Sequence, residues 1–91
     1  MMTKEKIQKL SKMFHILGHH TKLTVLSYVM SEDDAVVPTL VAYNLGIPVA
    51  QAAYSLKRMS EVNILTRSVS GRYTFYKPDP EFLSLLMEFI E

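Results

Sequence analysis

The sequence predicts a mainly helical domain with one small β-hairpin, in the order helix, helix, helix, helix, strand, strand, helix. Apolar residues recur with the helical period of about 3.6 residues over the first two thirds of the chain, and a segment rich in β-branched and aromatic residues, 65–77, follows. The helical pattern then returns in residues 79–91. A chain of 91 residues is long enough for one domain and too short for two, so we expect residues 1–91 to form a single domain.

The first two helices are predicted from their apolar patterns and end signals. Thr3 can cap a helix over residues 3–17, and Gly18 is a stop signal. The apolar stripe of this helix consists of Ile7, Leu10, Phe14 and Leu17, widened by Met13. A second helix, residues 22–30, is apolar over much of its circumference and is expected to lie deep in the domain.

The third and fourth helices match a helix-turn-helix pattern over residues 38–62. Pro38 fits the first turn of a short helix that ends near Gly46, and the tight turn "LGIP" leads into the next helix. Small and apolar side chains should hold the pair together, namely Ala42, Leu45, Ile47 and Ala52. The stripe of the fourth helix consists of Val49, Ala52, Leu56 and Met59. Helical hairpins in ordinary protein cores share this pattern, so the neighbouring elements must decide its meaning.

The hairpin and the last helix complete the predicted order. Ser70 and Gly71 supply a turn between two strands, and the hairpin, at about 64–77, should bury at least one of Tyr73, Phe75 and Tyr76. "DPEF" then supplies an Asp cap, a Pro at the first helical position and a Glu in the first turn. This helix has two apolar faces, formed by Phe82, Leu86 and Phe89 and by Leu83, Met87 and Ile90. One face can pack on its own domain, and the other requires a partner.

The charge is distributed unevenly although its net value is only +1. Residues 1–22 and 48–77 each carry +4, whereas residues 23–47 carry −3 and residues 78–91 carry −4. A basic segment at residues 48–77, centred on the fourth helix and the hairpin, is expected of a phosphate-binding face. A solvated charged surface is the alternative interpretation.

Composition argues against several other classes of protein. The chain has no cysteine, which excludes disulfides, thiolate catalysis and thiolate metal sites. Its apolar runs are too short to span a membrane, and residues 1–12 lack the apolar core of a signal peptide, so we expect a soluble, cytosolic protein without membrane association. No catalytic arrangement of Ser, His and acid or phosphate-binding Gly-rich loop is present, and we expect no enzyme activity and no cofactor.

Over almost its whole length, from Ile7 to Ile90, the chain resembles the small winged-helix regulators of the ArsR/SmtB class. "ILGHHTKLTVLSYV" is similar to the family segment "LADPTRLRILRLL", and "GRYTFYKP" to the wing "GRWVYYSL". "LVAYNLGIPVAQAAYSLKRMSEVNILTRS" is similar to "LAEALGLSQSTVSHHLKVLREAGLVRSR". The resemblance implies a winged helix-turn-helix fold, with the hairpin as the wing.

The resemblance also implies DNA-reading positions. The family's base-reading positions correspond to Ala50, Gln51, Ala53, Tyr54 and Ser55, with Lys57 and Arg58 one turn further along the helix. Gln can pair with adenine, Arg with guanine, and Ala only with a thymine methyl group. Because alanines replace the family's more polar residues, a sequence preference is expected to rest on few groups.

In the wing, Arg67, Ser70 and Arg72 are expected on the DNA backbone or in the minor groove. Solvation of an exposed hairpin is the alternative role for the two arginines. The first and last helices, 3–17 and 79–91, are expected to form a dimer interface. Its predicted residues are Ile7, Leu10, Phe14, Phe82, Leu83, Leu86, Phe89 and Ile90.

The three histidines are the only candidates for a metal site. His15 and His19 are four residues apart, but Gly18 between them indicates that the helix has ended. Metal sensors of the family use cysteines, or Asp and His pairs on the terminal helices, and this chain has no Cys and no His in its last helix. We therefore expect no metal site, and a helix-end or capping role for His19 and His20.

Together these features predict a homodimeric protein that binds double-stranded DNA and regulates transcription by occupying a promoter. Two recognition helices about one DNA turn apart would require an inverted-repeat operator. The alternative is a winged-helix module that binds another protein through its alanine-rich helix. The sequence does not indicate a small-molecule effector, the operator, or whether the effect is repression or activation.

Overall fold

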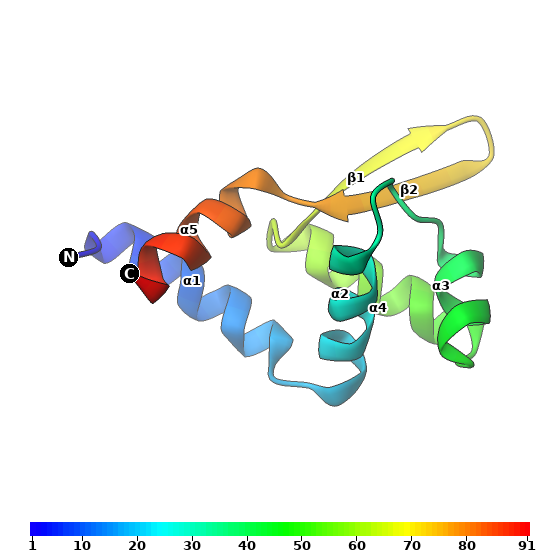
Figure 1. Ribbon diagram of the computed structural model, residues 1–91, viewed down its shortest axis with the longest axis horizontal. Helices are drawn as coiled ribbons and strands as arrows, with labels where there is room; N and C mark the ends of the chain where they lie inside the picture. Colours follow the sequence, from blue (N-terminus) through cyan, green and yellow to red (C-terminus); the bar gives the residue numbers. More distant parts are fainter.

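The computed structural model describes residues 1–91 and contains the seven elements in the predicted order. They are α1 (Lys4–Leu17), α2 (His20–Ser31), α3 (Pro38–Leu45), α4 (Val49–Glu61), β1 (Leu65–Ser70), β2 (Tyr73–Pro78) and α5 (Pro80–Ile90). Figure 1 shows α1 and α5 side by side at one end of an elongated molecule, with both chain termini, while the hairpin projects at the other end. None of the helices is long and apolar enough to cross a membrane.

Local side-chain and backbone contacts define most helix ends as predicted, but α2 begins at His20, two residues before the predicted start at residue 22. The hydroxyl of Thr3 accepts a hydrogen bond from the Lys6 amide, and a carboxylate oxygen of Asp79 accepts one of 2.8 Å from the Glu81 amide. Gly46 follows α3 with φ of 65°, and its amide donates to the Ala42 carbonyl. Such a left-handed conformation is accessible to Gly at little cost, so the turn between α3 and α4 can be tight.

The core lies around α4, which contacts α1, α2, α3 and β1. Its buried residues come from every helix and both strands: Leu10, Met13, Leu17, Val25, Leu26, Val29, Val36, Val41, Ala42, Ala52, Leu56, Met59, Ile64, Leu65, Tyr76, Phe82 and Leu85. Leu45 and Ile47 pack against this cluster, as expected of the residues that hold α3 against α4.

Three details of the predicted apolar stripes were wrong. Val49 is 50% exposed because it begins α4, one turn before the packed part of the helix. Ile7 and Phe14 are also exposed, and Met13 takes the central buried position of α1 instead. α2 buries only one face, since its Leu23 and Met30 remain about half exposed.

The hairpin is anchored at its base and free at its tip. Val36, in the loop before α3, forms an isolated bridge with Tyr76 through two backbone hydrogen bonds of 2.8 Å. Leu65 and Tyr76 are buried, whereas both strands are exposed toward the turn at Gly71, where φ is 61°. The burial of Tyr76 confirms that at least one aromatic residue of the hairpin belongs to the core.

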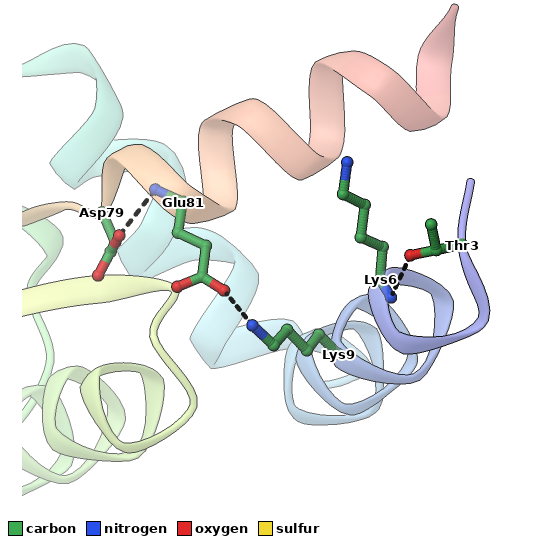
Figure 2. Close-up of polar contacts among 5 residues, drawn as sticks. All are labelled: Thr3, Lys6, Lys9, Asp79 and Glu81. Atoms are coloured by element: carbon green, nitrogen blue, oxygen red, sulfur yellow. Dashed lines mark hydrogen bonds and ion pairs between the residues drawn. The ribbon is translucent and has the colours of Figure 1, made fainter. Parts of the chain in front are cut away.

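Polar and aromatic contacts join α1 to α5. Lys9 forms an ion pair with Glu81 at 3.0 Å, which Figure 2 shows bridging α1 to the first turn of α5. Lys6 forms a second ion pair, with Glu88, also at 3.0 Å. The rings of Phe14 and Phe89 meet edge to face with centroids 5.6 Å apart. These contacts hold the first and last helices of the chain together at one end of the molecule.

Candidate nucleic-acid interface

The outward face of α4 carries most of the predicted reading residues. Ala50, Gln51, Tyr54 and Lys57 are all exposed, and Tyr54 keeps 59% of its surface open to solvent. Positions three or four apart lie on the same side of a helix, so these side chains form one row along α4. The buried stripe on the opposite side, Ala52, Leu56 and Met59, holds this row facing outward.

Ser55 must be removed from the predicted reading set. It is only 2% exposed and lies on the buried side of α4 with Ala52 and Met59. Its hydroxyl is therefore turned into the domain and cannot reach a base edge. Ala53, carried over from the family pattern, is partly buried.

Arg58 is partly engaged within its own helix. Its guanidinium donates to the Glu61 carboxylate at 2.9 Å, in an ion pair between residues three apart. This hydrogen bond with Glu61 raises the pKa of Arg58 above its ordinary value. The Glu61 carboxylate occupies one of the N–H donors of Arg58 and partly neutralises its charge, whereas Lys57 forms no ion pair.

Two residues that the sequence analysis did not assign to the site lie beside this row. The Gln51 carboxamide donates to the Thr21 hydroxyl at 3.2 Å, and the Lys22 ammonium lies 5.4 Å from the centre of the Tyr54 ring. Thr21 and Lys22 belong to the first turn of α2. Lys22 was visible only as part of a basic segment, and nothing in the sequence indicated Thr21.

The hairpin presents the predicted basic residues: Arg72 lies in the turn, whereas Arg67 lies in the middle of β1, opposite Tyr76. Arg67, Ser70 and Arg72 are all exposed, and neither arginine forms an ion pair. Tyr73 and Phe75, on the same strand, form a tilted ring pair with centroids 6.3 Å apart. The arrangement leaves two cationic side chains available to an anion on an extended, two-stranded support.

The beginning of α4 lacks the features that would neutralise its positive end. Its N-cap is Pro48, which forms no side-chain hydrogen bond, and its first turn contains no acidic residue. The first amides of a helix carry a partial positive charge. The start of α4 therefore adds to the charge of the basic segment, residues 48–77.

The predicted dimer residues divide into two groups. Leu10 and Phe82 are each 2% exposed and belong to the core of the protomer, so their assignment to an interface was wrong. Leu86 is partly buried against that core. The remaining residues are exposed on α1 and on both apolar faces of α5, and together with Met87 we term them the terminal apolar face: Ile7, Phe14, Leu83, Met87, Phe89 and Ile90.

The histidines are exposed and dispersed. The expected helix-end or capping role is met by the first alternative, because His19 occupies the N-cap position of α2 and its side chain forms no capping hydrogen bond. His15 lies on α1 and His20 begins α2. No group of three His, Asp or Glu side chains is placed to hold a metal ion.

Comparison with solved structures defines the fold. No family model and no curated protein matches the chain. A homodimeric winged helix-turn-helix DNA-binding domain from Mycobacterium bovis, Mb0332, described as a possible ArsR-family regulator, superposes with a TM-score of 0.74 at 13% identity, over 99% of this chain and 84% of that one. The antimony-specific transcriptional repressor AntR gives a TM-score of 0.74 at 21% identity, over 97% and 79%.

A possible transcriptional regulator for arsenical resistance gives a TM-score of 0.72 at 17% identity, covering 86% of this chain and 79% of that one. The chain has a winged helix-turn-helix fold. In this winged helix, α3 and α4 form the helix-turn-helix and the hairpin, residues 65–78, is the wing. The fold and element order predicted from the sequence are thereby confirmed.

Proposed function

We propose that this winged helix is a homodimeric transcriptional regulator that binds double-stranded DNA, with α4 in the major groove and the wing on the adjacent backbone. The observation that carries the proposal is the common exposure of Gln51, Tyr54 and Lys57 on α4 together with the unpaired Arg67 and Arg72 on the wing. Two proteins of the same fold are described as a DNA-binding domain and as a transcriptional repressor, which supports this interpretation.

The residues of α4 suit a major groove. That groove of B-DNA admits an α-helix, and its base edges can pair with a carboxamide or contact a methyl group. Gln51 supplies the carboxamide, Ala50 an exposed methyl group, and Lys57 a cation for a phosphate. Arg72 then contacts the backbone or the minor groove, because the tip of a wing beside a recognition helix falls there, and Arg67, on the same wing, supplies a second cation for a phosphate.

The terminal apolar face supports a dimer. An exposed cluster of large apolar side chains on α1 and α5 is unfavourable in water and is removed from it by a second copy of the same face. Ile90 at 67% exposure and Met87 contribute little to the fold of the protomer and so remain available to the partner. A two-fold axis here predicts an inverted-repeat operator.

Occupation of a promoter by such a dimer would repress transcription without an effector domain. We also infer that the protein acts in the cytoplasm, where it meets DNA. AntR is described as a repressor, which favours repression over activation for this chain as well. The proposal includes no catalytic step and assigns no cofactor.

A random-fragment DNA selection at near-physiological salt, followed by affinity measurements over a range of salt concentrations, tests the proposal. The key variant is Arg67→Ala/Arg72→Ala, and its matched control is Lys4→Ala/Lys12→Ala, which removes two exposed and unpaired cations from α1. We expect the wing variant to weaken binding to all sequences and to reduce the salt slope by about 0.9 for each phosphate that it no longer neutralises. The control should leave both unchanged.

Two outcomes would reject DNA binding as the function. Failure to retain any DNA above background is one, and binding that does not respond to salt is the other, because phosphate contacts release counterions. Either would favour the protein-interaction module, in which the outward face of α4 binds another protein.

A further inference from the structure

The outward row of α4 contacts the first turn of α2, which lies beside it. Thr21 accepts the Gln51 hydrogen bond at 3.2 Å, and Lys22 lies over the Tyr54 ring. Gln51 and Tyr54 are three residues apart and therefore neighbours on the same face. Two consecutive residues of α2 thus contact two consecutive members of the row, although they are separated from it by about thirty positions in the sequence.

The contact with Thr21 leaves one N–H donor and the carbonyl acceptor of Gln51 without a partner. A carboxamide has two N–H donors and one carbonyl acceptor, and the Thr21 hydroxyl occupies one donor. One N–H and the Oε1 atom remain free. These are the donor and the acceptor that adenine requires, at its N7 atom and its exocyclic amino group, in the major groove.

Thr21 also limits the freedom of Gln51. An exposed Gln on a helix samples many rotamers and loses conformational entropy when a base pair fixes it. Thr21 is partly buried in the first turn of α2, so it offers a fixed anchor to the exposed carboxamide. Because the Thr21 hydroxyl accepts a hydrogen bond from Nε2 of Gln51, it also orients the carboxamide so that Oε1 does not face Thr21.

The residues that precede Gln51 have no polar group to offer a base. Val49 and Ala50 are exposed and apolar, and such side chains can contact only the methyl group of thymine. They could not replace the hydrogen bonds that Gln51 would make. The choice of base near the start of α4 therefore depends on the carboxamide and on what orients it.

We propose that Thr21 is a positioning residue for Gln51, and that the pair selects an adenine in each half-site, next to a thymine whose methyl group meets Ala50. This inference rests on the proposed DNA-binding function and names the base that the site selects. Thr21 itself need not contact DNA, since it acts through the carboxamide.

The experiment compares Thr21→Val, which keeps the branched shape and removes the hydroxyl, with Thr21→Ser, which keeps the hydroxyl. Gln51→Ala and the double variant Thr21→Val/Gln51→Ala complete the cycle. Each protein is taken through the random-fragment selection. Its affinity is then measured for the wild-type consensus duplex and for the same duplex with the selected adenine replaced by guanine. Thermal unfolding followed by circular dichroism shows whether each variant is folded.

We expect wild type to prefer adenine by about tenfold or more, in the range of a good bidentate contact. Gln51→Ala should abolish the preference, Thr21→Val should reduce it severalfold, and Thr21→Ser should retain it. The double variant should resemble Gln51→Ala, because Thr21 has no effect without the carboxamide. Affinity for unrelated DNA should be the same for all of them, which a purely structural role of Thr21 would not predict.

Three results would overturn the inference. Thr21→Val could keep the full adenine preference, or it could weaken binding to every sequence alike. Wild type could also bind with a steep salt dependence and enrich no adenine, which rejects base selection by Gln51 and leaves non-specific DNA binding in place. Complete absence of DNA binding would instead reject the proposed function and this inference together.

Discussion

The two ends of this winged helix differ in their helix caps and in their ion pairs. The two helices that lie together at the terminal end, α1 and α5, begin with the capping side chains of Thr3 and Asp79, and both have an acidic residue in the first turn. Lys6 and Lys9 are paired with acids of α5. At the other end, α4 begins without a side-chain cap or an acidic residue, and no acid pairs with the cations of the wing.

This difference indicates which kind of partner each end suits. At the terminal end, where two lysines of α1 are paired with acids of α5, large apolar side chains are exposed as the terminal apolar face, which suits a second protein surface. Where charges and helix amides are left unsatisfied, an anion can complete them. The net charge of +1 does not reveal that paired charges and unpaired cations lie at different ends of the molecule.

The largest expected effect concerns how α4 is stabilised. Since its start has no side-chain cap, we expect the helix to depend on packing, and Leu56→Ala should lower the free energy of unfolding by about 2–5 kcal/mol. Leu56 is fully buried, whereas Lys57→Ala next to it should change stability by less than about 0.5 kcal/mol. Urea denaturation measures both. A decrease below about 1 kcal/mol for Leu56→Ala would show that packing is not what holds α4.

The next effect concerns the terminal apolar face. Ile90→Glu should convert dimer to monomer, because burying an unpaired carboxylate costs several kcal/mol and a two-fold interface would bury two. We expect the dissociation constant of the dimer to rise at least about 100-fold, measured by sedimentation velocity. Tyr43→Glu is the control, since Tyr43 is also a large exposed side chain but lies on α3. Equal effects of the two substitutions, or none from Ile90→Glu, would place the interface elsewhere.

The smallest expected effect separates the charges that form ion pairs within the protomer from those proposed to bind DNA. Lys9→Gln removes an ion pair whose side chains are both well exposed, so it should lower the free energy of unfolding by no more than about 1 kcal/mol, and added salt should remove the difference. Over the same range of salt, DNA affinity should fall steeply. A large decrease in stability that persists in high salt would mean that this ion pair is a structural requirement.

Much of the fold could be predicted because its signals are local. Thr3, Pro38, Gly46 and Asp79 mark helix ends through the conformation and hydrogen bonding of single residues, and each was found in the predicted role. The hairpin was predicted from its β-branched and aromatic residues and the turn at Gly71. Such signals act within a few residues, so no knowledge of the tertiary structure is needed to read them.

The site was predicted less completely because it depends on which apolar residues are buried and on distant contacts. Periodicity predicts Gln51, Tyr54 and Arg58 on the outward face of α4, and Gln51 and Tyr54 are exposed whereas Arg58 is partly buried. Ser55 was assigned to the same surface although it lies three residues after the buried Ala52. The spacing of Arg58 and Glu61 permits an ion pair, but a spacing alone does not say whether it forms.

The sequence by itself determined the order of the elements, most of their ends, the basic segment at residues 48–77 and the outward position of Gln51 and Tyr54 on α4, since each follows from backbone preference, helical period or charge along the chain. Only the tertiary structure decided that Leu10 and Phe82 belong to the core while Ile90 stays exposed, and that Thr21 meets Gln51. A helix that is apolar on two faces can bury either one, and residues thirty positions apart meet only when the packing of α2 on α4 brings them together.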